Sequence, residues 1–129
     1  MRHAVIRAIN EVGDGSINGA ALDFRFIYRL SGQVVVGAGA ATAGSLKLQF
    51  SNDPISMVNV APSGIITGVT NWTDFGTAVT VAGAAVQPIL FATVPWTDVG
   101  VSWIRAVYTD TSGGTGAGLL TVNLNIQGF

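Results

Sequence analysis

Hydrophobic and polar residues alternate along several short stretches of this sequence. The alternation is clean over residues 119 to 127, where Leu120, Val122, Leu124 and Ile126 occupy every second position between polar side chains. Successive side chains of a strand point to opposite faces, so this pattern predicts a strand with one buried face. Residues 101 to 109 are rich in β-branched and aromatic side chains, and four glycines follow before the next run begins. We therefore predict a β-hairpin with a long loop over residues 101 to 127.

The same alternation predicts two further strands. Over residues 45 to 51 it places Leu46, Leu48 and Phe50 on the inner face. Residues 21 to 30 show it most strongly, and we expect one continuous strand there with Leu22, Phe24, Phe26, Tyr28 and Leu30 sharing a face. Asp53-Pro54 ends the strand predicted over residues 45 to 51, because proline cannot donate a hydrogen bond to a neighbouring strand.

Weaker patterns predict strands over residues 2 to 9, 33 to 36, 77 to 81 and 86 to 94, with a short one near Ile65. Residues 2 to 9 fit either an edge strand or an arm, so residues 1 to 15 are a candidate N-terminal arm. Pro88 indicates an edge position for its strand.

Together these runs make about seven or eight short strands without helical periodicity, which is typical of a β-sandwich or a small barrel. We predict an all-β fold, an antiparallel β-sandwich formed by a single domain over residues 1 to 129. A chain of this length is long enough for one hydrophobic core.

The composition suggests that part of the surface is covered by another molecule. Hydrophobic residues make up 49% of the chain and charged residues only 10%, against about 25% charged residues in ordinary soluble domains. We therefore expect apolar surface to lie against other subunits or a larger assembly. The net charge of −1 gives no basic surface for nucleic acid. No apolar run is long enough for a transmembrane helix, so we expect no membrane partner.

Groups for catalysis are scarce. The chain has no cysteine, which excludes thiolate chemistry. Its one histidine, His3, lies near the terminus, whereas a catalytic base is usually held in a cleft by a second group, so we expect neither a Ser/His/Asp triad nor a multi-histidine metal site. Acidic residues in predicted loops, two of which would be needed for glycoside hydrolysis, are Glu11, Asp53, Asp74, Asp98 and Asp110. Aspartates are common in turns because they accept hydrogen bonds from backbone amides, and we favour that role. We predict a non-enzymatic protein without catalytic, cofactor-binding or metal-binding residues.

Three tryptophans, Trp72, Trp96 and Trp103, are either a platform for stacking sugars or anchors of the fold, and the second role is the commoner one in β domains. Trp103 shares its strand face with Arg105, while Ile104, Ala106 and Tyr108 take the other face. Both faces are then largely apolar. Either Arg105 is buried against a carboxylate, or its face is covered by a neighbouring molecule.

Several of these segments occur in a familiar order. The runs Leu46-Lys-Leu-Gln-Phe-Ser-Asn-Asp53, Asn71-Trp-Thr-Asp74 and Trp103-Ile-Arg-Ala-Val-Tyr-Thr109 precede a glycine-rich turn, an alternating strand and a terminal Gly128-Phe129. Over residues 44 to 129 the chain resembles a family of small virion proteins of tailed bacteriophages. The resemblance implies a jelly-roll-like β-sandwich with a structural role in a phage particle. Candidate interface or structural residues are Trp72, Asp74, Trp103, Arg105 and Tyr108.

Decoration or cement proteins of this size typically form trimers on the capsid. From the resemblance and the charge shortage we expect a homotrimer on the capsid surface of a virion, where it contacts the major capsid protein or other virion proteins. Candidate contact segments are residues 1 to 9 as an arm and the loops at residues 37 to 44 and 110 to 118. The alternative is a glycan-binding head-fibre, spike or tail module that contacts the host surface.

Overall fold

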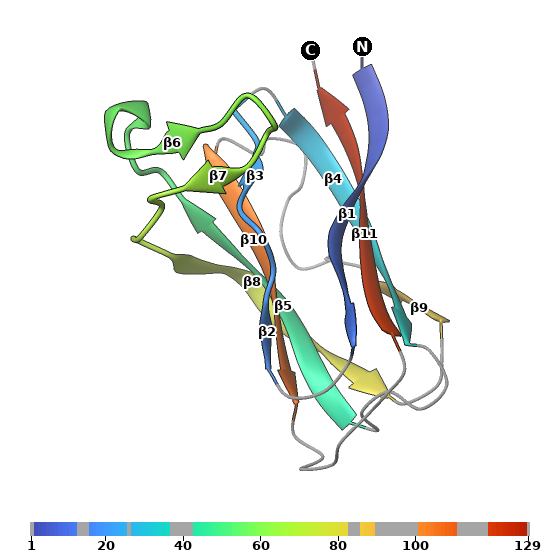
Figure 1. The fold of residues 1–129 in the computed structure, drawn as a ribbon. Helices are drawn as coiled ribbons and strands as arrows, with labels where there is room; N and C mark the ends of the chain where they lie inside the picture. The colour runs from blue at the N-terminus through green and yellow to red at the C-terminus, as the bar shows by residue number, and fades with distance from the viewer. Residues whose placement is uncertain are drawn as a thin grey trace.

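The protein forms two facing β-sheets. The structure is a computed structural model and describes residues 2–12, 16–25, 27–36, 43–82, 86–89, 101–110 and 119–128. Every strand pair in these ranges is antiparallel. Figure 1 shows the sheets lying face to face, so the predicted all-β antiparallel sandwich is confirmed.

One sheet, sheet A, has the strand order β1-β11-β4-β9. Sheet B has the order β2-β10-β5-β8, with β3 also paired to β10. A separate two-stranded sheet joins β6 to β7. The strands are β1 (Arg2–Val12), β2 (Ile17–Asn18), β3 (Leu22–Asp23), β4 (Ile27–Val36), β5 (Ala43–Ser51), β6 (Asn59–Val60), β7 (Ile66–Thr67), β8 (Thr73–Ala82), β9 (Val86–Ile89), β10 (Trp103–Asp110) and β11 (Leu119–Gly128).

The core lies between the two sheets and is formed by the side chains that point inward from the strands. Sheet A contributes Ala8, Ile9, Val34, Val122, Leu124 and Ile126, and sheet B with its adjoining segment contributes Ile17, Phe24, Leu46, Leu48, Ile104, Ala106 and Tyr108. The alternation predicted for residues 45 to 51 and 119 to 127 is confirmed, because Leu46, Leu48, Val122 and Leu124 have no exposed surface.

The predicted hairpin over residues 101 to 127 is wrong. Both runs are strands, but β10 lies in sheet B beside β5, whereas β11 lies in sheet A between β1 and β4. The two strands therefore face each other across the core. Alternation shows that a strand has one buried face, but it does not select the partner that completes the backbone hydrogen bonds.

The continuous strand predicted over residues 21 to 30 is also wrong, because the chain passes from sheet B to sheet A within it. The side chain of Asp23 accepts hydrogen bonds from the backbone N–H of Arg25 at 3.1 Å and from its guanidinium at 2.7 Å. The N–H of Ile27 then bonds to the carbonyl of Phe24 at 3.1 Å. A local turn of this kind competes with a sheet ladder. Beyond it, residues 27 to 36 form one strand rather than a separate strand from residue 33.

Two edge predictions can be compared with the sheet order. β1 pairs with β11 along its length and stands at the end of the described strand order of sheet A, so residues 2 to 12 form an edge strand. In the described part of sheet A, β9 with Pro88 pairs only with β4, which confirms its edge position. Residues 37 to 42 and 111 to 118, which include most of the two loops expected to make contacts, lie outside the described residues.

Between β5 and β8 the chain leaves the sandwich. We call residues 52 to 72 the excursion; it holds a 3-10 turn (Ile55–Met57) and the β6-β7 hairpin. In Figure 1 the excursion stands outside the two sheets, at the end where β5 finishes and β8 begins. Its hairpin turn is closed by the N–H of Gly64, which donates to the carbonyl of Ala61 at 2.8 Å. The φ of Gly64 is 88°, a left-handed value that favours glycine.

Candidate functional site

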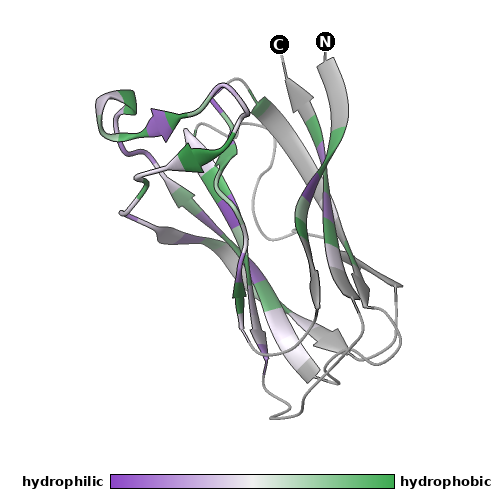
Figure 2. Cartoon of the chain, viewed as in Figure 1, coloured by the Kyte–Doolittle hydropathy of each residue, from purple (hydrophilic) through white to green (hydrophobic). Residues whose placement is uncertain are grey.

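The excursion exposes most of the large apolar side chains that lie on the described surface. Of five such exposed side chains, four belong to it, namely Ile55 (52%), Met57 (57%), Val60 (40%) and Ile65 (64%). No ionisable side chain occurs from residue 54 to residue 73. Figure 2 shows hydrophobic segments along the excursion as well as along the strands of the sandwich. The excursion therefore exposes four large apolar side chains on a segment without ionisable groups, among exposed polar residues such as Asn59 and Thr67.

A buried aspartate holds the base of the excursion. Asp53 lies at its start, and its carboxylate accepts hydrogen bonds from the backbone N–H groups of Thr70 at 2.8 Å and Asn71 at 3.2 Å. The side-chain amide of Asn71 donates to the other carboxylate oxygen at 2.6 Å. We call these three residues the anchor. They join the two ends of the excursion, which compensates for the marginal stability of an isolated two-stranded hairpin.

The hydrogen bonds of the anchor also set the charge of Asp53. Its side chain is only 6% exposed. Donation by Thr70, and then by Asn71, lowers the pKa of Asp53 from 3.8 to about 2, because each bond favours the ionised carboxylate. The carboxylate is therefore charged at neutral pH and its oxygens are occupied. Among the alternatives weighed from the sequence, this arrangement agrees with aspartate as an acceptor of backbone amides.

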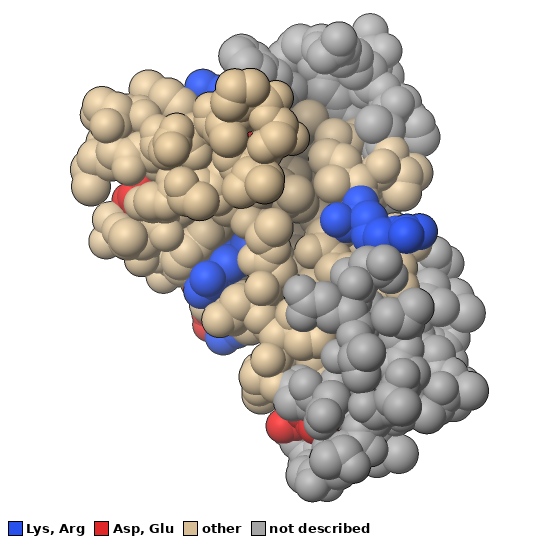
Figure 3. All heavy atoms as spheres, viewed as in Figure 1, with Lys and Arg blue, Asp and Glu red and all other residues tan. Residues whose placement is uncertain are grey.

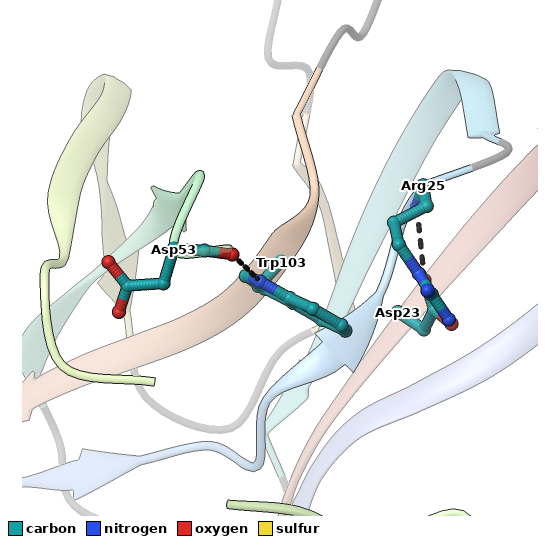
Figure 4. A network of polar contacts seen from close by, with 4 residues as sticks. All are labelled: Asp23, Arg25, Asp53 and Trp103. Carbon is teal, nitrogen blue, oxygen red and sulfur yellow. Dashed lines mark hydrogen bonds and ion pairs between the residues drawn. The ribbon is translucent and has the colours of Figure 1, made fainter. Parts of the chain in front are cut away.

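Trp103 ties the anchor to the sandwich. Its indole Nε1–H donates to the backbone carbonyl of Asp53 at 2.9 Å. Figure 4 shows the indole between Asp53 and the Asp23–Arg25 pair, with the carboxylate of Asp53 turned away from the ring. The guanidinium of Arg25 lies 5.2 Å from the centre of the ring, a cation–π distance. Trp103 is thus held on both sides by its own chain.

The outer face of sheet B carries a row of polar side chains. Arg105, Gln49 and Asp74 are register neighbours on β10, β5 and β8. Arg105 Nε donates to Gln49 Oε1 at 2.9 Å, and Gln49 Nε2 donates to Asp74 Oδ1 at 3.0 Å. Lys47 reaches the same carboxylate at 3.1 Å. We call these four residues the polar row. The bond from Gln49, followed by that from Lys47, lowers the pKa of Asp74.

Trp72 connects the excursion to the polar row. It is half-buried at the end of the excursion, directly before β8. The guanidinium of Arg105 lies 4.5 Å from the centre of its ring. Arginine stacks readily on aromatic faces because its planar cation is weakly hydrated. The excursion is therefore fixed to sheet B at two places, at Asp53 through Trp103 and at Trp72 through Arg105.

The structure divides the five residues proposed from the sequence into two groups. Trp72, Asp74 and Arg105 come together on the outer face of sheet B. Trp103 and Tyr108 are buried, with 0% and 1% of their surface exposed. Trp103 is buried by its own chain, through Asp53 and Arg25, so its burial needs no neighbouring molecule. Arg105 is half-buried, but its partners are Gln49 and Trp72 rather than a carboxylate.

Three contributors were missed in the sequence. Lys47 and Gln49 alternate with Leu46, Leu48 and Phe50, so the sequence predicts that they point outward. Their partners depend on the register of β5 with β8 and β10. The role of Asp53 as the centre of the anchor depends on Thr70 and Asn71, which are distant in sequence. Trp96, Asp98 and the side chains of His3 and Glu11 lie outside the described part of the chain.

The described residues contain no group of three or more metal-ligating side chains placed to hold an ion. Within the same ranges, no helix has the length and hydrophobicity needed to cross a membrane. What the site offers chemically is a set of exposed apolar side chains on the excursion and a stacked Trp72–Arg105 pair at its end, features that suit binding.

No model of a known protein family matches this chain, and comparison with curated proteins gives no match.

Proposed function

We propose that this chain is a non-enzymatic structural protein of a tailed-bacteriophage virion, a capsid decoration or cement protein that binds the shell as a homotrimer. The observation that carries the proposal is the anchored excursion, which displays Ile55, Met57, Val60 and Ile65. Apolar residues on a fixed projection suit a permanent contact with another protein, because their burial removes apolar surface from water.

Two features of the sequence support a virion as the setting. One is the resemblance of residues 44 to 129 to small phage virion proteins. The other is the low share of charged residues, 10%. Figure 3 agrees with the second point, since charged side chains are few on the coloured part of the face that it shows.

The proposed mechanism is stabilisation by preferential binding. A protein that binds only the assembled shell shifts the equilibrium towards that shell by mass action. Many modest apolar contacts, repeated over all copies of the shell, would then raise the temperature or force at which the shell opens. No catalytic step is needed.

The test uses particles of the phage that encodes the chain. Mass spectrometry and antibody labelling of purified particles should find the chain on the capsid, and light scattering of the purified protein should give the mass of a trimer. Shells stripped of the chain should bind it again and open at a higher temperature. Absence of the chain from the particles, or a monomer that does not bind the stripped shells, would contradict the proposal.

A second candidate is a glycan-binding module of a head fibre, spike or tail. It is favoured by half-buried Trp72 beside the polar row, since aromatic rings and planar polar groups are common in sugar sites. Against it, Arg105 already stacks on the ring, and Gln49, Asp74 and Lys47 bond to one another. A glycan array separates the two candidates: binding that is lost in Trp72→Ala, with the fold intact, would support the glycan module.

A further inference from the structure

Arg105 differs from Arg25 and Lys47 in the partners of its charge. Arg25 forms an ion pair with Asp23 at 2.7 Å, and Lys47 forms one with Asp74 at 3.1 Å. Arg105 instead contacts neutral groups, the amide oxygen of Gln49 and the ring of Trp72. In the described residues it has no salt bridge.

This arrangement leaves a partly desolvated charge without an anion. Arg105 is half-buried, and burial lowers its pKa. The nearest carboxylate along the polar row, that of Asp74, lies beyond Gln49 and is already bonded to Gln49 and Lys47. A charge removed from water is costly unless it is paired, so the position favours the arrival of a counter-ion.

The geometry also prepares Arg105 to receive one kind of anion. Stacking on Trp72 and the bond from Nε to Gln49 restrict the guanidinium, while its two terminal nitrogens form no hydrogen bond within the described residues. A guanidinium presents these N–H groups as a planar fork that matches a carboxylate. Because less side-chain freedom remains to be lost on binding, a restricted fork binds more tightly than a free one.

The surroundings indicate where the carboxylate comes from. Trp72 belongs to the excursion, whose residues from 54 to 73 include no ionisable side chain. A partner that docks on this segment meets the cation of Arg105 where it stacks on Trp72. A single acidic side chain within an apolar contact region complements such a surface in both charge and hydrophobicity.

We propose that Arg105, positioned by Trp72 and Gln49, is the receptor for an Asp or Glu carboxylate on the partner protein that docks on the excursion. The inference rests on the proposed function, in which the partner is a protein of the capsid shell. The carboxylate accepts two parallel hydrogen bonds from the terminal nitrogens of Arg105, and the apolar contacts of the excursion exclude water around the pair.

The test compares three variants for binding to particles stripped of the chain. Arg105→Met keeps the stacking stem and removes the charge; it should weaken binding at least about tenfold and remove most of its salt dependence. Arg7→Met is the control, because it removes one positive charge from an exposed position on β1, away from the polar row; it should change affinity less than about threefold. Arg105→Lys should give an intermediate loss, since ammonium lacks the fork.

Stability measured on the same variants excludes a purely structural role. Arg105→Met should change the unfolding temperature only slightly, because losing the bond to Gln49 and the cation–π contact with Trp72 is offset by removal of a partly buried charge. If its unfolding temperature falls while binding is retained, Arg105 only packs against Trp72 and the inference is wrong.

Chemical crosslinking locates the acid. In Arg105→Lys, a carbodiimide should join the new amine to an Asp or Glu of the shell, and mass spectrometry identifies the pair. Residual binding without a crosslink at position 105 contradicts the inference. Wild-type protein that does not bind the shells overturns the proposed function and this partner together. Arg105-dependent binding to sialylated or uronic-acid glycans instead would assign the carboxylate to a sugar and overturn the protein partner.

Discussion

The sandwich core buries its large apolar side chains, whereas the excursion exposes its own to solvent. In the core, side chains such as Leu48 and Leu124 have no exposed surface and are held by one another across the two sheets. In the excursion, Ile65 is 64% exposed, and the segment is held by polar contacts of Asp53 and by the stacking of Trp72 on Arg105.

The difference teaches that order in this protein has two separate sources. Burial of apolar area stabilises the sandwich, at roughly 25 cal/mol per Å² removed from water. The excursion buries little apolar surface of its own and depends on a few hydrogen bonds at its base. Its apolar side chains are therefore available for contacts with another molecule, and changing them should affect binding more than folding.

The largest expected effect comes from truncating the core. Leu48→Ala should lower the free energy of unfolding by about 2–5 kcal/mol, because it removes buried methyl groups and leaves a cavity. Ile65→Ala, at the exposed tip of the excursion, should stay within about 0.5 kcal/mol of the wild type. Urea denaturation of both variants checks the comparison, and similar losses at the two positions would contradict it.

A close backbone approach should give the next effect. Gly19 lies between β2 and β3, where a Cβ would stand 2.8 Å from the carbonyl oxygen of Ala8 and 2.9 Å from that of Ala106. Neither backbone atom can move without disturbing its strand. Gly19→Ala should therefore destabilise the sandwich by about 1–3 kcal/mol. An unchanged denaturation midpoint would show that β1 and β10 lie further from this segment.

Trp103→Phe tests the contact between the sandwich and the excursion. The change keeps an aromatic ring but removes the Nε1–H that donates to the carbonyl of Asp53. A buried acceptor left without its donor should cost about 1–3 kcal/mol. Backbone amides of residues 59 to 67 should also exchange faster with solvent, because the anchor is loosened. Faster exchange in β11 instead would place the main role of Trp103 in the core.

Acid should weaken the excursion through Asp53. Because its pKa is about 2 in the folded chain and ordinarily 3.8, its contribution to stability is complete above the ordinary pKa and is lost as the pH falls through the folded pKa. Asp53→Asn should therefore be less stable than the wild type near neutral pH, and the gap should narrow towards about pH 2. Thermal unfolding over this range measures the gap; a constant gap would exclude titration of Asp53 as the cause.

Much of the sandwich could be predicted from the sequence, because alternation reports directly which side chains face the core. Leu46 and Leu48 on one strand, and Val122 and Leu124 on another, were placed correctly for this reason. The pairing of strands was not predictable in the same way. β10 and β11 lie next to each other in the sequence and both have the required pattern, yet they belong to different sheets.

The candidate site was harder to predict because it depends on contacts between distant residues. Trp72, Asp74 and Arg105 were chosen individually, but their association requires the register of β5 with β8 and β10. A neighbouring molecule was one expected cover for the strand face that carries Trp103. Nothing local in the sequence shows that Asp53, at the start of the excursion, packs against this residue. Within residues 21 to 30, the side chain of Asp23 accepts hydrogen bonds from the backbone N–H and the guanidinium of Arg25, and the regular pattern does not reveal the turn that these bonds stabilise.

The most direct test of the account is whether the exposed apolar side chains of the excursion bind the shell. Val5, which is 65% exposed on β1, supplies a control with nearly the same exposure as Ile65 at 64%. Stripped particles should sediment with Val5→Asp as they do with the wild type, whereas Ile65→Asp should lose at least about tenfold in affinity while its unfolding temperature stays the same. Equal cosedimentation of the two variants would contradict the account.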